Sequence, residues 1–358
     1  MRVRRTAVLT AAALALLPMA PAHATGAVGP VQRVTGNNCY HSVTVTPPDG
    51  ITRGFANCSS GVRYVQGSGT TWSTAASPYG PNEVIAAVAV DGSTTWMITS
   101  NANGTFLRSR TGTTYNAGKR LTATRSLRDS AALLAVGGRY LAVWSDNGPN
   151  NSGAHLWEAH TLGGNAAPKK LYGDDNDPNY YETNPQLAYQ PSTHRAVLVW
   201  QHQKTTSITS VLMTNGGGGP WATVRTVAPN SYRPSLALSG STVAVGYGRL
   251  GGSTCGCAGA VSTGTTSGMT ATHALSGELT WGPLVAVSNG VLGAVWVMRT
   301  NTSPQPVRIT TRSGGVWSER ILGTPYPQGN AIEGVGSAGG RLRFFATYDP
   351  NFVGVRSQ

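Results

Sequence analysis

The chain has few acidic residues, and three of them stand where catalysis by paired carboxylates would need them. Asp129, Glu182 and Glu333 each lie where a polar loop leads into an apolar, strand-like run, among only 14 Asp and Glu in 358 residues. Two carboxyl groups that flank a glycosidic bond can act as the acid and as the nucleophile or base. Carboxylates held close together repel, so one of them is expected to keep its proton. We therefore expect these three residues to be the catalytic groups if the protein is a glycoside hydrolase.

Four other residues at strand ends have side chains suited to holding a substrate. Tyr181 and Arg233 would orient it, Trp281 would line the same pocket, and His202 could act as a general base. If His202 removes a proton while Arg or Lys neutralises a uronate, the reaction would be that of a polysaccharide lyase. Strand-end loops are polar in most β proteins, so a purely structural explanation of these residues also stays open.

The stretch from Tyr172 to Glu182 has the densest acidic side chains. Asp175 and Asp177 lie in it and could hold Ca²⁺, which binds several oxygen ligands from one flexible loop. The stretch has no EF-hand pattern, and a solvated turn built on Asp, Asn and Pro explains the same residues. With Tyr180 and Tyr181, the same acidic residues could also form a sugar-binding lip. Ca²⁺ is therefore one of three open interpretations, and the sequence indicates no required cofactor.

These side chains would be positioned by a repeat of about fifty residues. Between positions 184 and 227, four short apolar or alternating runs are separated by turns rich in Gly, Pro, Ser and Asn, and the last run is expected over 221–227. An aromatic residue closes the second run of successive copies, with spacings of 56, 47, 49 and 52 residues, at Trp144, Trp200, Tyr247, Trp296 and Tyr348. Four strands per copy at this period predict an all-β fold, a single β-propeller.

The copies predict a closed ring of blades. Counting two degenerate copies near the N-terminus gives seven four-stranded blades, and the last copy has only three strands before position 358. The segment Pro30–Val34 precedes the first copy and is expected to supply the missing outer strand. Such closure removes an open sheet edge. The alternative is six full blades followed by a stub.

The N-terminal segment predicts secretion. Residues 1–24 have three early arginines, an apolar run and a small-x-small site at 22–24, as in a signal peptide. The propeller would then occupy residues 25–358 as one domain, extracellular and monomeric. Outside the leader, no apolar run is long enough for a transmembrane segment. The formal net charge is +13, but it is not gathered into a basic stripe, so no nucleic acid is expected as a partner.

Four cysteines in a secreted chain predict disulfides. Cys39 and Cys58 flank a hairpin turn symmetrically, so they should lie opposite each other and form a bridge. Cys255 and Cys257 are separated only by a glycine, and a bridge within that loop is expected.

Three turns indicate a family likeness. They read Gly67–Trp72, Asn215–Trp221 and Arg312–Trp317, with a glycine and a closing tryptophan in each. This pattern resembles a degenerate form of the Asp-box hairpin of sialidase-like β-propellers, although the Asp is replaced in all three turns. The resemblance implies a propeller with its site on the face where strands enter the channel. It also implies that these turns themselves have no catalytic role.

Together these features favour a secreted propeller that binds or processes an extracellular carbohydrate. A sialidase-like glycoside hydrolase or a polysaccharide lyase would act on a glycan or on a cell-envelope polymer. The alternative is a non-catalytic propeller that presents the same face to a protein partner or an envelope polymer. Fold alone does not decide between them.

Overall fold

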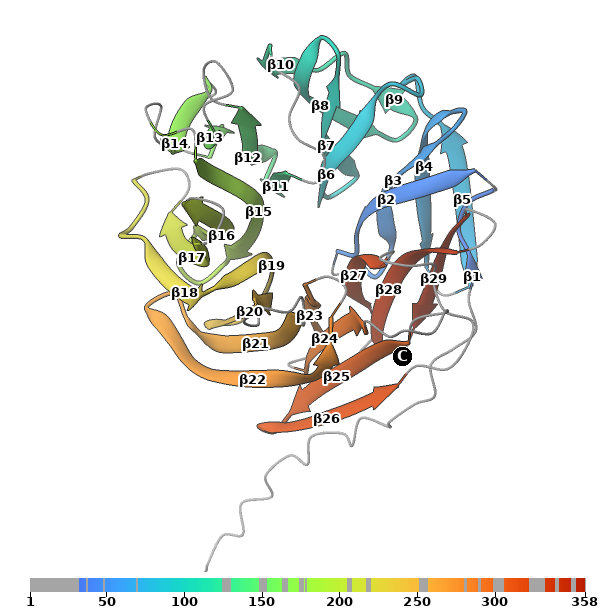
Figure 1. The fold of residues 1–358 in the computed structure, drawn as a ribbon. Coiled ribbons are helices and arrows are strands. Elements are labelled where there is room, and N and C mark those ends of the chain that lie inside the picture. The colour runs from blue at the N-terminus through green and yellow to red at the C-terminus, as the bar shows by residue number, and fades with distance from the viewer. Residues whose placement is uncertain are drawn as a thin grey trace, which may run out of the picture.

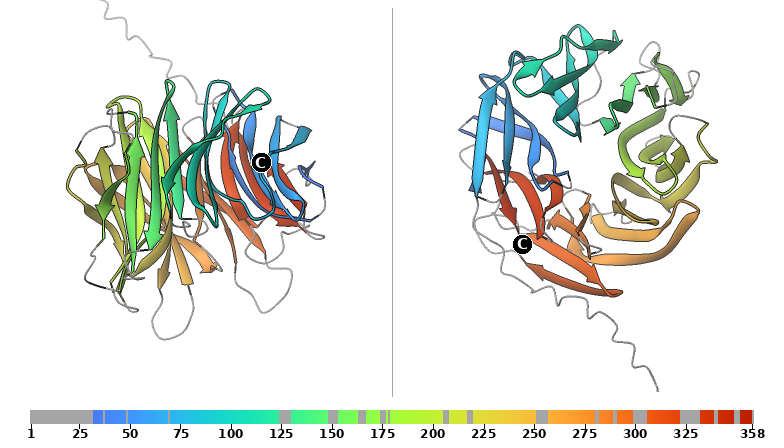
Figure 2. Two further views of the ribbon diagram at one scale, coloured as in Figure 1. Left: turned by 90° about the horizontal axis from the view of Figure 1, so that it is seen from above. Right: turned by 180° about the vertical axis from the view of Figure 1, so that it is seen from behind.

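The computed structural model shows strands arranged radially around a central axis, in chain order (Figure 1). Seen from the side, the sheets stand upright next to each other and form a thick disc (Figure 2). The structure describes residues 32–36, 38–47, 49–68, 70–123, 130–147, 153–162, 167–173, 177, 179–204, 208–216, 220–250, 257–279, 282–288, 291–298, 306–321, 332–338, 341–348 and 352–357. All the regular elements in these residues are strands. The fold is therefore all-β, and its arrangement is that of a β-propeller.

Three sheets have four antiparallel strands each, in chain order from the axis outward. The first contains β2 (Cys39–Val45), β3 (Thr52–Cys58), β4 (Gly61–Ser68) and β5 (Thr71–Ala76). The second contains β19 (Ser231–Ser239), β20 (Thr242–Leu250), β21 (Cys257–Thr265) and β22 (Gly268–Glu278). The third contains β23 (Leu284–Ser288), β24 (Val291–Val297), β25 (Val307–Ser313) and β26 (Val316–Ile321).

Two sheets are larger. A five-stranded sheet contains β6 (Val84–Asp91), β7 (Thr94–Asn101), β8 (Gly104–Thr111), β9 (Thr114–Tyr115) and β10 (Lys119–Thr122). An eight-stranded sheet begins with β11 (Ala131–Val136), β12 (Arg139–Asn147), β13 (Ala154–His160) and β14 (Lys169–Tyr172). It continues with β15 (Tyr180–Gln190), β16 (Arg195–Lys204), β17 (Ile208–Gly216) and β18 (Arg225–Pro229). Its two halves are joined by parallel pairing of Ala154 with Tyr181.

The remaining sheet combines segments from opposite ends of the sequence. It contains β27 (Ile332–Ala338), β28 (Arg341–Tyr348), β29 (Phe352–Ser357) and β1 (Gln32–Arg33). Strand β1 pairs antiparallel with β29, with Gln32 opposite Val355 and Arg33 opposite Gly354. The outer position of this early segment agrees with the sequence prediction. It covers the edge of β29 that would otherwise have unpaired backbone groups.

Hydrophobic clusters hold neighbouring sheets together. The inner strands contact one another around the axis, in the order β2, β6, β11, β15, β19, β23 and β27, and β27 contacts β2. The closing aromatics of four second strands are at most 2% exposed, at Trp144, Trp200, Tyr247 and Trp296. Each packs in a cluster that joins two successive units of the ring. The repeat seen in the sequence is therefore a repeat of buried contacts between sheets.

The hairpin cysteines are bonded as predicted. Cys39 lies directly opposite Cys58 in the β2–β3 ladder, with their Cα atoms 3.9 Å apart, and the two form a disulfide. The bridge packs with Val34 and Phe345, next to the sheet that contains β1. Cys255 lies outside the described residues. Cys257 begins β21, opposite Leu250, and its side chain is not described.

One strand differs from its predicted position. The run from 221 to 227 was expected to be an outer strand, but β18 begins at Arg225. Trp221 instead lies in the preceding irregular segment, and its indole N–H donates to Glu158 Oε2 at 3.0 Å. A buried carboxylate needs such a donor, and this side-chain contact replaces regular strand pairing at Trp221. In the part of the chain that the structure describes, no helix is long and apolar enough to cross a membrane.

Candidate functional site

The central feature of the candidate site is a carboxylate–imidazole pair, Glu182 with His202. The two residues lie directly opposite each other in the β15–β16 ladder. The His202 Nδ1 and Glu182 Oε1 atoms are 2.8 Å apart. The other carboxylate oxygen, Oε2, accepts the indole N–H of Trp200 at 2.6 Å. The Glu182 side chain is 5% exposed and that of His202 is 21% exposed, so the imidazole lies between the buried carboxylate and solvent.

Strand geometry explains why these three side chains meet. Trp200 and His202 are two residues apart on β16, and alternate side chains of a strand point to the same face. Cross-strand pairing puts Glu182 beside His202 on that face. The ladder shifts register between Thr183 and Gln186, opposite Trp200. Such a bulge bends the inner strand locally and re-aims its side chains.

The other half of the eight-stranded sheet supports the pair. Ser145 on β12 donates its hydroxyl hydrogen to the main-chain carbonyl of Glu182 at 2.7 Å. Tyr172 on β14 stacks on the indole of Trp200, with ring centroids 4.7 Å apart and an angle of 18° between the planes. Burial raises the pKa of Tyr172 above its ordinary value of 10.0, which keeps this phenol neutral. Both the backbone and the indole partner of Glu182 are thus fixed by the preceding unit.

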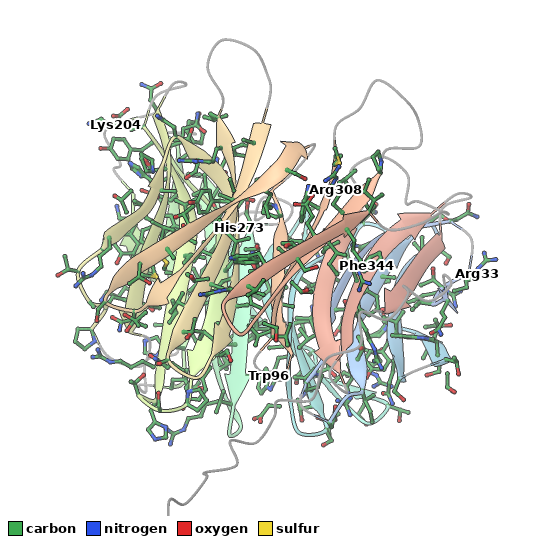
Figure 3. All side chains as sticks on the ribbon, turned by 90° about the horizontal axis from the view of Figure 1, so that it is seen from below. Arg33, Trp96, Lys204, His273, Arg308 and Phe344 are labelled. Carbon is green, nitrogen blue, oxygen red and sulfur yellow. A yellow bond between two sulfur atoms is a disulfide. The ribbon has the colours of Figure 1, made fainter. Side chains whose placement is uncertain are left out.

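Two polar side chains, Tyr180 and Lys204, lie next to the pair toward solvent, and Tyr181 lies between Tyr180 and Glu182 on the other face of β15. The ring of Tyr180 meets the imidazole of His202 edge-on, with centroids 5.3 Å apart. The ammonium group of exposed Lys204 lies 5.3 Å from the centre of the same Tyr180 ring. Tyr181 is 40% exposed. Lys204 lies at one face of the disc, and Trp96 lies toward the opposite face (Figure 3). Since the pair lies near the start of β15 and the end of β16, it is on the face where the inner strands begin.

This arrangement is suited to moving a proton. A carboxylate only accepts hydrogen bonds, so Nδ1 of His202 carries the hydrogen that Glu182 receives. In the neutral ring this assignment leaves Nε2 with a free electron pair, ready to accept a proton. Lys204 adds a positive charge near the same edge. The site thus contains a base, a phenol and an ammonium group within one edge of a hairpin.

Arg233 lies on the next unit and contacts the opposite side of β16. Its main-chain N–H donates to Gln201 Oε1 at 2.9 Å, and Asn184 donates its amide to the same oxygen at 3.2 Å. Gln201 alternates with Trp200 and His202, so it points to the other face of the strand. Arg233 and Asn184 both have positive φ values, 49° and 52°, at register shifts of their inner strands. These two bulges repeat one local geometry in adjacent units.

The other predicted site residues are described only in part. Asp129, Trp281 and Asp175 lie outside the described residues. Glu333 lies in β27 at a register shift between Ile332 and Gly334, and its side chain is not described. Convergence of the three carboxylates therefore stays a prediction.

Asp177 is described, and it shapes a turn. Its Oδ1 accepts the N–H of Asn179 at 2.9 Å, and its main-chain oxygen accepts that of Tyr180 at 3.2 Å. These contacts give the aspartate a turn-forming role just before β15. No group of three or more His, Cys, Asp or Glu side chains placed to hold a metal ion occurs in the described part of the chain.

A second buried glutamate shows that position alone does not make a site. Glu83 immediately precedes β6 and is 8% exposed. Its Oε1 is 3.0 Å from Arg108 Nη2, and its Oε2 accepts the amide of Asn101 at 2.6 Å. Arg108 also lies over the Tyr79 ring, 4.6 Å from its centroid. Glu83 is thus neutralised inside its own sheet, whereas the partners of Glu182 are an indole and an imidazole.

Sequence reasoning did not assign Ser145, Tyr172 or Trp200 to the site. Trp200 was recognised only as a closing aromatic, although its two-residue spacing from His202 already places both on one strand face. Ser145 and Tyr172 belong to the preceding repeat. Their approach to Glu182 depends on how two sheets join, which no local pattern shows.

A small pocket lies elsewhere, on the face opposite the pair. It has a volume of about 170 Å³ and lies between β19–β20 and the β23–β26 sheet. Arg312, Ser239 and Thr242 supply its polar lining. The Glu182–His202 pair therefore does not line this pocket, and the candidate site is defined by the hydrogen bonds of the pair.

Comparisons with known proteins support the fold class. No family model matches the chain, and no curated protein matches it in sequence. Hydrazine synthase from Kuenenia stuttgartiensis is similar in structure, with a TM-score of 0.57 and 13% identity over 90% of this chain and 96% of that one. The polysaccharide lyase Uly1 has a TM-score of 0.56 and 8% identity, covering 91% of each chain. The β-propeller domain of the Trilobed protease from Pyrococcus furiosus has a TM-score of 0.53 and 7% identity, covering 90% of this chain and 94% of that one.

These similarities define a class rather than a family. The identities are far below the level at which function is shared, so the matches show the fold alone. The protein is a β-propeller with a buried carboxylate–imidazole pair on the face where its inner strands begin.

Proposed function

We propose that the protein is a secreted, carbohydrate-active β-propeller whose Glu182–His202 pair removes a proton from an acidic polysaccharide. His202 is the base, Glu182 holds it, and Lys204 neutralises the uronate carboxylate. Tyr180 is the acid that protonates the departing sugar oxygen. This division of roles is that of a polysaccharide lyase.

The proposed reaction balances without a cofactor. His202 Nε2 takes the proton from the carbon next to the uronate carboxyl group. The electron pair of that C–H bond forms a carbon–carbon double bond, and the neighbouring bond to the glycosidic oxygen breaks. The phenol hydrogen of Tyr180 passes to that oxygen. Solvent then returns one proton to Tyr180 and removes one from His202, so no net oxidation occurs.

The observation that carries this proposal is the half-buried imidazole of His202 hydrogen-bonded to a buried carboxylate. A base needs a fixed orientation and a route to substrate; the hydrogen bond to Glu182 orients His202, and its side chain is 21% exposed. The polysaccharide lyase Uly1 has a similar scaffold, and this likeness supports a lyase as one of the candidate activities. Because the identity is only 8%, the likeness supports the scaffold and not the residue roles.

The hydrolase reading assigns the carboxylates differently. Both oxygens of Glu182 already accept hydrogen bonds, and its side chain is 5% exposed. A glycosidase nucleophile or acid must reach the glycosidic bond directly. A hydrolase would therefore depend on Asp129 and Glu333, with Arg233, Tyr181 and Trp281 orienting the sugar.

A substrate panel separates these readings. The purified protein is incubated with uronate polysaccharides and with neutral glycans, and products are followed by reducing ends and by ultraviolet absorbance. Elimination creates a double bond conjugated with the carboxyl group, which absorbs, whereas hydrolysis does not. We expect absorbing products from a uronate polymer, and their loss in His202→Ala. Glu83→Gln is the matched control and should keep full activity per folded molecule.

Other outcomes are equally informative. Reducing ends without absorbance would favour the hydrolase reading. If no glycan is cleaved but one is bound, the protein is a carbohydrate-binding propeller. If the whole panel is neither cleaved nor bound, the carbohydrate proposal fails. A protein partner would then be sought on the face that contains Tyr181 and Lys204.

We also propose that the ring has seven blades. The eight-stranded sheet divides into β11–β14 and β15–β18, which are joined through the Ala154–Tyr181 bridge. Among the described residues, each of seven hydrophobic clusters lies between neighbouring units. Electron-microscopy projections along the axis would count the blades, and six lobes would refute this number. Secretion through removal of residues 1–24 would be tested by N-terminal sequencing of the exported protein.

A further inference from the structure

We propose that Trp200 and Tyr172 are positioning residues that fix the tautomer of His202 through Glu182. This inference rests on the proposed function only in taking His202 as the base. The chain of contacts runs from the Tyr172 ring to the Trp200 indole, then to Glu182 Oε2, and from Oε1 to His202 Nδ1. It begins on β14 and ends on β16, so it crosses the seam between two four-strand units.

Two tryptophans at matching positions show that Trp200 does more than fill the core. Trp144, Trp200 and Trp296 each close a second strand and are at most 1% exposed. The indole nitrogens of Trp144 and Trp296 are buried with no hydrogen-bond partner among the described residues. Within the described part of the chain, these two indoles therefore contribute by packing. The indole of Trp200, in contrast, donates to a carboxylate.

Stacking on Tyr172 fixes the direction of that indole. The two rings lie within 18° of parallel, and Tyr172 comes from the adjacent unit. Offset aromatic pairs of this kind stabilise one ring orientation beyond the effect of the area that they bury. Ser145 holds the main chain of Glu182 from the same side. The carboxylate can therefore rotate only by breaking its hydrogen bonds with Trp200 and His202, and the preceding unit holds both the Trp200 ring and the main chain of Glu182 in place.

A fixed carboxylate selects one form of the imidazole. With the hydrogen on Nδ1, His202 donates to Glu182 and keeps Nε2 as the proton acceptor. With the hydrogen on Nε2, the Nδ1 electron pair would face the carboxylate oxygen and be repelled by it. If Glu182 were free to turn away, both forms of the ring would be populated. Trp200 and Tyr172 would thus keep the reactive nitrogen unprotonated and facing outward.

The test measures the tautomer directly. Nitrogen-15 chemical shifts of the His202 ring, read from long-range ¹H–¹⁵N spectra at a pH where the ring is neutral, give the ratio of the two forms. The wild-type protein should hold its hydrogen on Nδ1. Trp200→Phe keeps an aromatic ring but removes the donor, and it should shift the ratio about tenfold toward Nε2–H, the effect of weakening one charged hydrogen bond.

Matched variants separate positioning from folding. Trp296→Phe removes an unpartnered indole at the corresponding place in another sheet and should leave the ratio unchanged. Tyr172→Phe keeps the stacking ring and should also preserve it, whereas Tyr172→Leu should shift it. If Trp200→Phe fails to fold, the two Tyr172 variants still decide the question.

The inference is overturned if Trp200→Phe folds with an unchanged ratio, or if Tyr172→Leu and Tyr172→Phe behave alike. The readout requires no glycan turnover. If Trp200→Phe shifts the tautomer ratio but the wild-type protein cleaves no glycan, the lyase proposal is refuted and the positioning role stands. If His202→Ala abolishes turnover while Trp200→Phe changes neither turnover nor the tautomer ratio, the lyase proposal stands and the positioning role is refuted.

Discussion

Glu83 and Glu182 lie at comparable places in two sheets, each across from the end of the second strand, but their partners differ. Glu83 is paired with Arg108 and with Asn101. Glu182 is held by Trp200 and His202. The first arrangement neutralises a buried charge within its own sheet. The second couples a buried charge to a ring that reaches solvent, and this difference leads to the first prediction.

Arg108→Met should destabilise the fold without changing the chemistry of the rim. Removing one member of a buried ion pair leaves an uncompensated charge, which costs about 3 kcal/mol. Urea denaturation should show this loss, while the tautomer ratio of His202 should stay as in the wild type. An unchanged unfolding midpoint would contradict the structural role of the Glu83–Arg108 pair.

Gly153→Ala should damage the seam between β13 and β15. Gly153 has φ of 78°, and a Cβ there would overlap the main-chain carbonyl of Tyr180. Gly240→Ala is the control, because Gly240 has φ of 57° but a Cβ added to it would have no other atom within 4 Å. The control should lose only about 1 kcal/mol of stability, which is the cost of placing an alanine in the left-handed conformation. Thermal unfolding of the two variants compares them, and equal losses would show that the seam tolerates the methyl group.

Replacing Cys39 and Cys58 by alanine should lower the free energy of unfolding by about 3 kcal/mol. The bridge spans a sequence separation of 19, and closing a loop of this size restricts the unfolded chain by roughly that amount. A non-reducing digest should first yield the two linked peptides from the wild type. Free thiols at both positions, or equal stability of the double variant, would count against the bridge.

Removal of residues 25–36 should destabilise the closing sheet. The deletion exposes the edge of β29 and takes Val34, which is 4% exposed, out of its cluster with Phe345. Loss of a buried apolar side chain alone costs about 3 kcal/mol. The melting temperature should fall, and size-exclusion chromatography should show association of the shortened protein. The melting temperature of Val34→Ala should lie between those of the shortened and the full-length protein. A shortened protein that melts like the full chain would refute the closing role of β1.

Stability should decline on acidification because of His273. Its ring stacks on Trp317 at 4.2 Å, and burial lowers its pKa below the ordinary 6.5, partly offset by the charge of Glu319. Below pH 6.5 the unfolded chain therefore takes up a proton that the folded chain resists. The stabilisation that neutral His273 contributes to folding is complete above pH 6.5 and is lost as the pH falls through the lowered pKa of the folded state.

His273→Phe keeps an aromatic stack and should flatten the pH dependence of the melting temperature just below pH 6.5. Glu319 contributes in a separate, lower range. Burial raises its pKa, but hydrogen bonds from Ser276 and Arg308 outweigh this and bring the pKa below its ordinary 4.5. Since Glu319 is present in both proteins, their difference isolates the histidine. Parallel curves for the two proteins above pH 4.5 would refute the assignment.

The repeat was predictable because its residues act locally. Trp144, Trp200 and Trp296 close apolar strands in the sequence and are buried between sheets in the structure. The symmetric spacing of Cys39 and Cys58 about a turn likewise fixed their pairing in advance. Such features depend only on strand alternation and turn geometry, and both can be read from short stretches of sequence.

The site was predictable only in part, because the surroundings that distinguish Glu182 from other buried glutamates come from contacts between units. Glu182, His202 and Tyr181 could be placed on the correct face from strand order. The different surroundings of Glu83 and Glu182 could not be predicted, since Arg108 reaches Glu83 from a third strand and Tyr172 reaches Trp200, the partner of Glu182, from an outer strand. Those distances depend on how far each strand bulges and on the packing of whole sheets.

The Ala154–Tyr181 bridge has a consequence for motion. Backbone hydrogen exchange usually reports cooperative units that open separately. Here a single parallel pair, Ala154 with Tyr181, joins two four-strand units, and Glu182 lies one residue from that pair. Amides next to this pair on β13 and β15 should therefore exchange together, in a single partial unfolding event. The Glu182–His202 pair would become disordered in the same step that separates β13 from β15. The time for which the pair stays ordered is therefore set by the opening rate of this junction and not by the global stability of the ring.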